Sequence, residues 1–198
     1  MNPFAAYIEL LTKPKTFYKK YKDQPKKVLL LNYAIMSVLF LIALLGVLFA
    51  ERLSAIELTF TIIILLIMFA IGVPLLVGIS GLIYHIGVLI FGGRGISKSI
   101  TIFGASLLIG LPYGLINLFF EIAFGELIGL LLSIPVSVIA LIHVIYAEVQ
   151  GIQVHYKFPT GKAILISLFP LIIGAILGII LFILIIIALI GVGVAGGL

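Results

Sequence analysis

Uninterrupted apolar runs of about 20 residues or more are the feature that most constrains this chain. Such a run is long enough to cross the roughly 30 Å hydrocarbon core of a bilayer as an α-helix. Apolar residues make up 64% of the 198 residues and charged residues only 10%, whereas about a quarter of the residues of a soluble domain are charged. We therefore expect an all-α polytopic membrane protein, a bundle of helices whose backbone polar groups bond within each helix.

Polar segments divide the apolar sequence into five predicted transmembrane helices. They cover about residues 28–50, 57–91, 98–120, 127–150 and 162–190. A basic cytosolic arm, residues 1–27, precedes this five-helix transmembrane domain, residues 28–198. The second run would measure roughly 52 Å as a straight helix. Because no polar turn divides it, we expect one span that tilts, or bends near Pro74.

The positive charges are distributed unevenly between the two ends of the predicted spans. A cytosolic N-terminus places 11 of the 12 basic residues on the inside. The outer side then carries only Arg52, together with Glu51, Glu57, Glu121 and Glu126. Because basic residues accumulate in cytoplasmic loops, we predict that the N-terminus is cytosolic and the C-terminus lies outside.

The arm is both basic and aromatic. Asn2 followed by Pro3 predicts a helix start, and apolar side chains then recur on one face of a short amphipathic helix. That face carries Phe4, Tyr7, Ile8 and Leu11. The seven lysines of the arm are Lys13, Lys15, Lys19, Lys20, Lys22, Lys26 and Lys27. We expect them to bind anionic lipid at the cytoplasmic face, at roughly 1 kcal/mol per lysine. Nucleic-acid binding is the rival interpretation, which we reject because a span begins at residue 28.

A glycine-rich loop joins the second and third predicted spans. It consists of Gly92, Gly93, Arg94 and Gly95. His85 precedes the loop, Ser97 is a predicted helix cap, and Lys98 follows. We favour a tight hairpin with an arginine that sets topology. The alternative is a cradle for an anion such as a lipid phosphate. The loop lacks the Walker pattern, so the sequence does not predict nucleotide binding.

Ionisable side chains within spans are costly and are therefore candidate functional groups. The polar residues placed at the membrane boundary are His143, Glu148 and Lys162. One hypothesis joins His85, His143 and Glu148 in a cluster that binds a metal or relays protons. A separation of five residues puts His143 and Glu148 on different helix faces. We therefore favour the alternative, in which Glu148 pairs with Arg94 or Lys98 and each histidine bonds a neighbouring helix.

Two further patterns concern helix contacts. Gly-x-x-x-Gly pairs let helix backbones approach closely, within the bundle or in a dimer. The three pairs are Gly110/Gly114, Gly125/Gly129 and Gly174/Gly178. Asn117 and Glu121 could either line a water-filled opening or contribute one hydrogen bond between packed helices. We prefer the second interpretation. Cysteine and hydrolase or metalloprotease motifs are absent from the sequence, so we predict no enzyme and no cofactor or metal site.

Three segments together resemble the YIP family, whose members carry a Ypt/Rab-interacting protein domain. These segments are Leu10–Phe17 with its Pro-x-x-Phe pattern, His85–Lys98 with the glycine loop and the later Pro112, and Gly151–Pro170 with Gly161-Lys162-Ala163. They bracket nearly the whole chain. The resemblance implies a five-span layout with a cytosolic N-terminus. Eukaryotic members resemble membrane-trafficking factors that bind small GTPases.

We expect a prokaryotic-type member of the family, located in the prokaryotic cell membrane. Its expected function is an interaction or membrane-organising role without enzymatic activity. The arm of 27 residues is short for the family, which argues against a GTPase partner. Another membrane protein is an alternative partner to lipid. The rival function is a small transporter or channel subunit. Prolines within the predicted spans favour it, but the near absence of charge at mid-membrane opposes it.

Overall fold

The computed structural model describes residues 2–22, 24–50 and 55–195, and these residues form helices joined by short connections, without a strand. The helices are α1 Pro3–Thr12, α2 Pro14–Lys20, α3 Pro25–Ala50, α4 Ala55–Ile67, the π-helical segment η1 Met68–Gly72, α5 Val73–Ile90, α6 Ile96–Phe124, α7 Glu126–Tyr156 and α8 Thr160–Ala195. The predicted all-α fold is confirmed.

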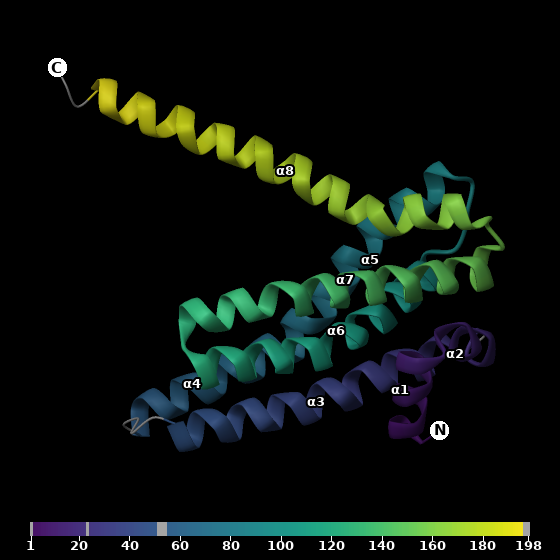
Figure 1. Cartoon of the computed structure of the whole chain (residues 1–198), viewed down its shortest axis with the longest axis horizontal. Helices are drawn as coiled ribbons and strands as arrows, with labels where there is room; N and C mark the ends of the chain where they lie inside the picture. Colours follow the sequence, from purple (N-terminus) through teal and green to yellow (C-terminus); the bar gives the residue numbers. More distant parts are fainter. Residues whose placement is uncertain (1, 23, 51–54, 196–198) are drawn as a thin grey trace.

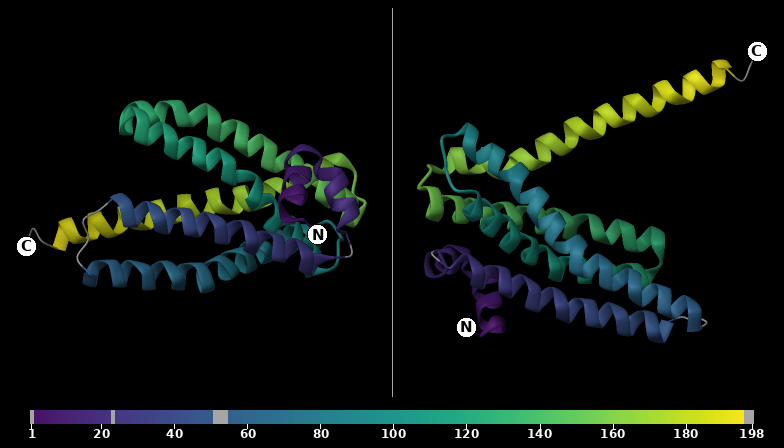
Figure 2. Two further views of the ribbon diagram at one scale, coloured as in Figure 1. Left: turned by 90° about the horizontal axis from the view of Figure 1, so that it is seen from below. Right: turned by 180° about the vertical axis from the view of Figure 1, so that it is seen from behind.

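The long helices α3 to α7 lie alongside one another, and α8 diverges from them (Figure 1). The short helices α1 and α2 fold across one end of the bundle. The α5–α6 and α7–α8 connections lie at this same end, and the α6–α7 connection lies at the opposite end (Figures 1 and 2). We call the end that carries α1 and α2 the arm end.

Four helical segments of the described chain are long and apolar enough to cross a membrane. They are Ala70–Ile90, Ile96–Phe124, Glu126–Tyr156 and Thr160–Ile187. The chain is therefore an integral membrane protein. The first predicted span lies in α3, a helix of 26 residues that is outside this count because most of its side chains after Leu39 are not described. Glu51 and Arg52, which the orientation argument used, also lie outside the described residues.

The second predicted run is a helical path with one irregular segment. It passes from α4 through the π-helical segment η1 into α5. Pro74 lies in the first turn of α5 and has no N–H to donate to the preceding turn. A wider π turn directly before the proline accommodates the missing bond. The expected irregularity near Pro74 is observed.

Helix starts follow the sequence signals only in part. The Asn2 side chain caps α1 as predicted, because it accepts hydrogen bonds from two backbone N–H groups at 3.0 and 3.3 Å. Ser97 does not cap α6, since the φ of 102° at Gly95 turns the chain into the helix before Ser97. Thr160 lies inside α8, and its hydroxyl accepts a hydrogen bond from Gln153 at 2.9 Å.

The buried core lies at the arm end. The arm contributes Ala6, Leu10, Phe17, Tyr18 and Tyr21 to it. The remaining members come from the arm-end halves of the long helices: Val28, Leu31, Tyr84, Val88, Ile102, Ala105, Leu108, Ile109, Ala147, Val149, Ile152, Ala163 and Ile166. The arm is therefore packed into the same core as the transmembrane helices.

The helix α1 presents apolar side chains on two faces. Ala6 and Leu10 are buried against the bundle. On the predicted apolar face, Phe4 is 73% exposed and Ile8 is 43% exposed. The amphipathic face identified in the sequence therefore points outward at these two positions, whereas Tyr7 and Leu11 of the same face pack against the core.

Candidate functional site

The glycine loop ends α5 with a tight, internally bonded turn. Gly92 adopts a φ of 84°, a left-handed conformation that glycine tolerates well. Its N–H donates to the carbonyl of Leu89, and the N–H of Gly93 donates to the carbonyl of Val88, each at 2.9 Å. These two bonds form a Schellman cap. Because both donors are used by the helix, the geometry favours the hairpin interpretation over the anion cradle.

A chain of hydrogen bonds connects His85 with this loop. The Nδ1 atom of His85 lies 2.9 Å from the Ser99 hydroxyl, which lies 2.8 Å from the Tyr156 hydroxyl. Tyr156 in turn donates to the carbonyl of Gly95 at 3.0 Å. A carbonyl only accepts, so Ser99 donates to Tyr156 and His85 donates from Nδ1 to Ser99. The chain joins α5, α6 and α7 to the loop.

Tyr156 is the centre of this arrangement, and the sequence analysis missed it. The Nζ atom of Lys98 lies 5.6 Å from the centroid of the Tyr156 ring, in the range of a cation–π contact. The Phe158 ring stacks on the Tyr156 ring, with ring centroids 5.8 Å apart. The structure thus gathers His85, Gly95 and Lys98 around one tyrosine, whereas Arg94 is exposed.

Glu148 is a buried carboxylate between three helices. It is 4% exposed and accepts hydrogen bonds from Ser106 of α6 at 2.8 Å and Ser167 of α8 at 2.5 Å. The predicted pairing with Arg94 or Lys98 is wrong, because α7 directs Glu148 towards α6 and α8 and away from the loop.

His143 attaches the arm to the bundle. Its Nε2 atom lies 2.9 Å from the carbonyl of Leu11, and its Nδ1 atom lies 2.8 Å from the Tyr113 hydroxyl. Since the carbonyl only accepts, Nε2 carries the donated proton and Nδ1 accepts from Tyr113. The expected bonds from His85 and His143 to neighbouring helices are confirmed. The cluster of these histidines with Glu148 is not formed, because each side chain has separate partners.

Two tyrosines of the arm add hydrogen bonds to α6. Tyr7 donates to the carbonyl of Leu108 at 3.1 Å, and Tyr18 donates to the carbonyl of Ile102 at 3.3 Å. Burial raises the pKa of both tyrosines above the ordinary value of 10.0, and the nearby charge of Glu148 raises the pKa of Tyr18 further. The hydroxyl groups therefore stay protonated and keep donating at neutral pH.

The predicted membrane-surface lysines divide into three groups. Lys20 donates to Glu9 at 3.0 Å, and this hydrogen bond raises the pKa of Lys20. Lys13, Lys26 and Lys27 are exposed. The remaining three line a pocket of about 460 Å³ between α2 and the end of α7. Its lining residues are Lys15, Lys19, Lys22, Gln153, Val154, Lys157 and Phe158. Lys162 is exposed in the first turn of α8.

Comparison with known proteins identifies the family of this chain. Residues 8–182 match the Yip1 domain. The chain belongs to the Yip1 domain family. The predicted family is therefore confirmed. The match extends from α1 into α8, so that the polar contacts of His85, His143 and Glu148 lie within the Yip1 domain, whereas Asn2 and Tyr7 precede it. No curated protein and no solved structure matches the chain.

The glycine pairs of the Yip1 domain differ in their surroundings. A Cβ atom added at Gly129 would lie 2.6 Å from the Cα atom of Glu121, so this glycine allows the close α6–α7 contact near their connection. The glycines of the other two pairs, by contrast, have no neighbouring atom within 4 Å of an added Cβ: Gly110, Gly114, Gly174 and Gly178. The expected close packing within the bundle is not observed at those four positions.

Asn117, in the half of α6 that lies away from the arm end, makes one helix-packing hydrogen bond. Its Nδ2 atom donates to the Ser137 hydroxyl at 3.0 Å. Glu121 is exposed beside the α6–α7 connection. The geometry supports the interpretation of Asn117 as a helix-packing residue over that of a residue lining a water-filled opening.

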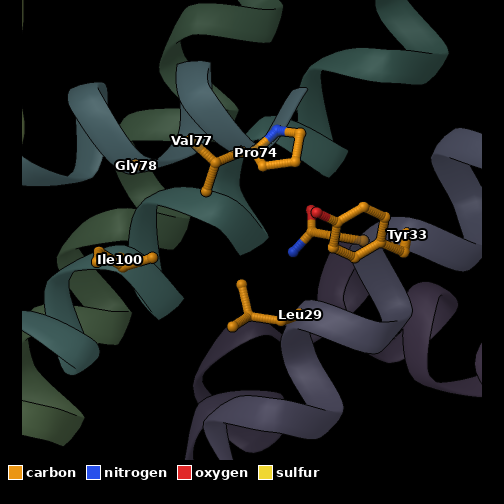
Figure 3. Close-up of a pocket in the computed structure, with 7 residues that line it drawn as sticks. Leu29, Tyr33, Pro74, Val77, Gly78 and Ile100 are labelled. Carbon is orange, nitrogen blue, oxygen red and sulfur yellow. The ribbon is translucent and has the colours of Figure 1, made fainter. Parts of the chain in front are cut away.

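A second hollow of the Yip1 domain is apolar. It has a volume of about 210 Å³ and lies between Leu29 and Tyr33 of α3, Pro74 and Val77 of α5, and Ile100 of α6 (Figure 3). Asn32 also lines it, but its amide donates to the carbonyl of Val28 at 3.2 Å within its own helix. The hollow lies between helices and has no acidic or basic side chain among its lining residues.

Proposed function

We propose that this Yip1-domain protein organises the membrane without catalysing a reaction, by holding anionic lipid against a basic arm docked on the cytoplasmic end of its helix bundle. The docking of the arm is the observation that carries the proposal. Tyr7, Tyr18 and the carbonyl of Leu11 bond to α6 and α7, so the arm presents its lysines on a rigid support. A rigid support lowers the entropy lost when lipid binds.

The proposed topology has five spans, with the N-terminus in the cytosol and the C-terminus outside, in a prokaryotic cell membrane. The basic arm and the two connections that carry Arg94 and Lys157 share one end of the bundle (Figure 1), which agrees with the accumulation of basic residues on the cytoplasmic side. In this arrangement α3 is the first span. Reporter fusions at residues 125 and 198 test it, and activity of both fusions only outside the cytosol is expected.

The exposed apolar face of α1 supports a role in the cytoplasmic leaflet. Phe4 and Tyr7 of α1 face Ile35 and Val38 of α3 across an apolar groove of about 390 Å³. In the proposed orientation, this groove opens towards lipid, and α1 inserts as an interfacial helix does. Such a helix occupies area in one leaflet only, which links lipid binding to local membrane organisation.

Lipid retention during purification tests the proposal. The full chain is purified in mild detergent from vesicles of neutral lipid with and without an anionic phospholipid, and bound lipid is measured by mass spectrometry. We expect enrichment of the anionic lipid by the natural chain and loss of that enrichment when the seven arm lysines are replaced by glutamine. Equal lipid composition for both chains would overturn the proposal.

A transporter or channel subunit is the second candidate, and one observation favours it. Glu148 is a buried carboxylate within a spanning helix, and such groups often mark ion or proton pathways. Proteoliposome flux measurements with the natural chain and with Glu148→Gln separate the two functions. Flux that the glutamine variant abolishes, while lipid enrichment is unchanged, would favour transport.

A further inference from the structure

The basic pocket between α2 and the end of α7 is the most concentrated positive site in the described part of the chain. Its lining brings together Lys15, Lys19 and Lys22 of the arm and Lys157 from the α7–α8 connection. No carboxylate belongs to the described lining, and Glu9 is engaged elsewhere by Lys20. Four ammonium groups around one hollow of about 460 Å³ therefore lack a protein counter-charge among the described residues.

The folding of α2 determines this concentration of charge. Lys15 and Lys19 are four residues apart, which places them on one face of α2. Lys22 follows in the turn directly after the helix. The opposite face is buried through Phe17 and Tyr18, and Tyr18 is bonded to α6. The helix cannot rotate to separate the three lysines without exposing these aromatic side chains.

Lys157 enters the pocket from a strained backbone position. With φ 57° and ψ 28°, it caps α7 in the left-handed region, and it is the one non-glycine residue with positive φ among the residues that the structure describes. Glycine is the residue usually found at such a cap. Strain of this kind is often associated with a functional position, and here it carries an ammonium group to the lysine face of α2.

We propose that this pocket binds the headgroup of an anionic phospholipid that carries two negative charges on its phosphate, such as a phosphomonoester. A phosphate offers several acceptor oxygens, and lysines bind it as mobile point charges. A doubly charged headgroup compensates four ammonium groups better than a phosphodiester with one charge. The α5–α6 and α7–α8 connections lie at this end of the bundle (Figure 1), which places the pocket at headgroup level.

Val154 and Phe158 give the pocket an apolar side. They form an apolar wall beside the four lysines, so one surface accepts the phosphate and another can contact the glycerol and upper acyl chain. This combination favours a lipid over a free phosphate ion. The inference rests on the proposed function, because it specifies which lipid the docked arm selects.

A charge-matched pair of variants tests the inference. Binding of phosphatidic acid and of phosphatidylglycerol to the purified full chain, in vesicles of neutral lipid, is compared for Lys19→Gln/Lys157→Gln and for Lys26→Gln/Lys27→Gln. Both variants lose two positive charges. We expect the pocket pair to weaken phosphatidic acid binding by about tenfold or more relative to the control pair. The control pair should lower the binding of both lipids to a similar extent, because Lys26 and Lys27 contribute only to the surface charge of the arm.

Each alternative outcome has a defined meaning. Equal loss in both variants would overturn the pocket and leave the proposed function standing, because the arm would then act through its total charge. The absence of anionic lipid binding by the natural chain would overturn both proposals. Competition by soluble glycerol phosphate as effective as the lipid would show a site for free phosphate and overturn the assignment to a lipid.

Replacement of Lys157 by glycine separates binding from folding. Glycine relieves the left-handed strain, so the Lys157→Gly chain is expected to keep or raise its Tm in lipid-free detergent. The same variant is expected to bind phosphatidic acid several-fold more weakly, because one of four charges is lost. Unchanged affinity for phosphatidic acid in this folded variant would overturn the role of Lys157.

Discussion

The two ends of the helix bundle are held by different interactions. At the arm end, α6 buries Ile102, Ala105 and Leu108 completely and forms hydrogen bonds with α1, α2, α5 and α7. At the other end, Phe119 of the same helix is 61% exposed and Ile122 is 76% exposed. One helix therefore has a protein interior around its first half and an outward apolar surface around its second.

The helix α8 repeats this contrast. Its first turns bury Ala163 and Ile166 and contribute Ser167 to the Glu148 contact, whereas Leu181 and Phe182 are 59% and 64% exposed. In a bilayer, lipid tails are as apolar as these side chains, so their exposure to lipid carries little cost. Polar bonds and close packing hold the arm end together, and the lipid surrounds the other end. The following changes test this division.

The largest effect is expected at Glu148. Glu148→Ala removes the acceptor of Ser167, leaves Ser106 with only its bond to the Phe103 carbonyl, and opens a cavity. We expect a loss of about 2–4 kcal/mol in the free energy of unfolding. Denaturation in mild detergent, followed by circular dichroism, measures it. Glu148→Gln keeps the size and one acceptor oxygen and should lose less than half as much. A change below about 0.5 kcal/mol in the alanine variant would contradict the division.

The next largest difference in stability is expected between alanine substitutions at Gly129 and at Gly174. Gly129→Ala would press a Cβ atom against the backbone of Glu121, whereas Gly174→Ala meets open space. We expect the first substitution to cost about 1–3 kcal/mol, and the second to be neutral or stabilising because alanine favours helix over glycine. Thermal unfolding of the two variants in one detergent gives the comparison. Equal destabilisation would mean that α8 has a partner around Gly174.

The hydrogen-bond chain at the loop should contribute less than Glu148. Ser99→Ala leaves His85 and Tyr156 without their shared partner in a buried site, at a cost of about 1–2 kcal/mol. Because Tyr156 also bonds to Gly95, the 92–95 loop should become more accessible. Limited proteolysis at Arg94 with trypsin measures this, with Ser97→Ala as the exposed control. Identical cleavage rates for the two variants would argue against the linkage.

The arm should also become less stable at alkaline pH. The unfolded Tyr18 releases its proton near its ordinary pKa of 10.0, whereas the folded side chain has a higher pKa because it is buried. The folded state then binds more protons, so its stability falls as the pH rises above 10, by about 1.4 kcal/mol per pH unit for one tyrosine. Tyr18→Phe should reduce this slope between pH 10 and 11. An unchanged slope would show that Tyr18 remains buried in the unfolded reference state.

Sequence signals predicted the structure correctly where the interaction joins residues that are close together in the chain. The cap at Asn2, the irregular helix before Pro74 and the glycine turn after α5 depend on residues within a few positions of one another. The serine signal at the start of α6 was less reliable, because a serine can either cap a helix or lie within its first turn. Ser97 was the predicted cap, but Gly95, two residues earlier, occupies the cap position.

The sequence by itself determined that this is an all-α integral membrane protein of the Yip1 family, because long apolar runs have only helical solutions in lipid and the family pattern is read residue by residue. Only the tertiary structure decided which helix face points inward. It joined Glu148 to two serines, placed Tyr156 beside His85 and Lys98, and brought Lys157 next to the lysines of α2. In helices that are apolar all round, hydrophobicity does not distinguish a lipid-facing side from a protein-facing side. Packing and a few polar bonds therefore determine which face is buried.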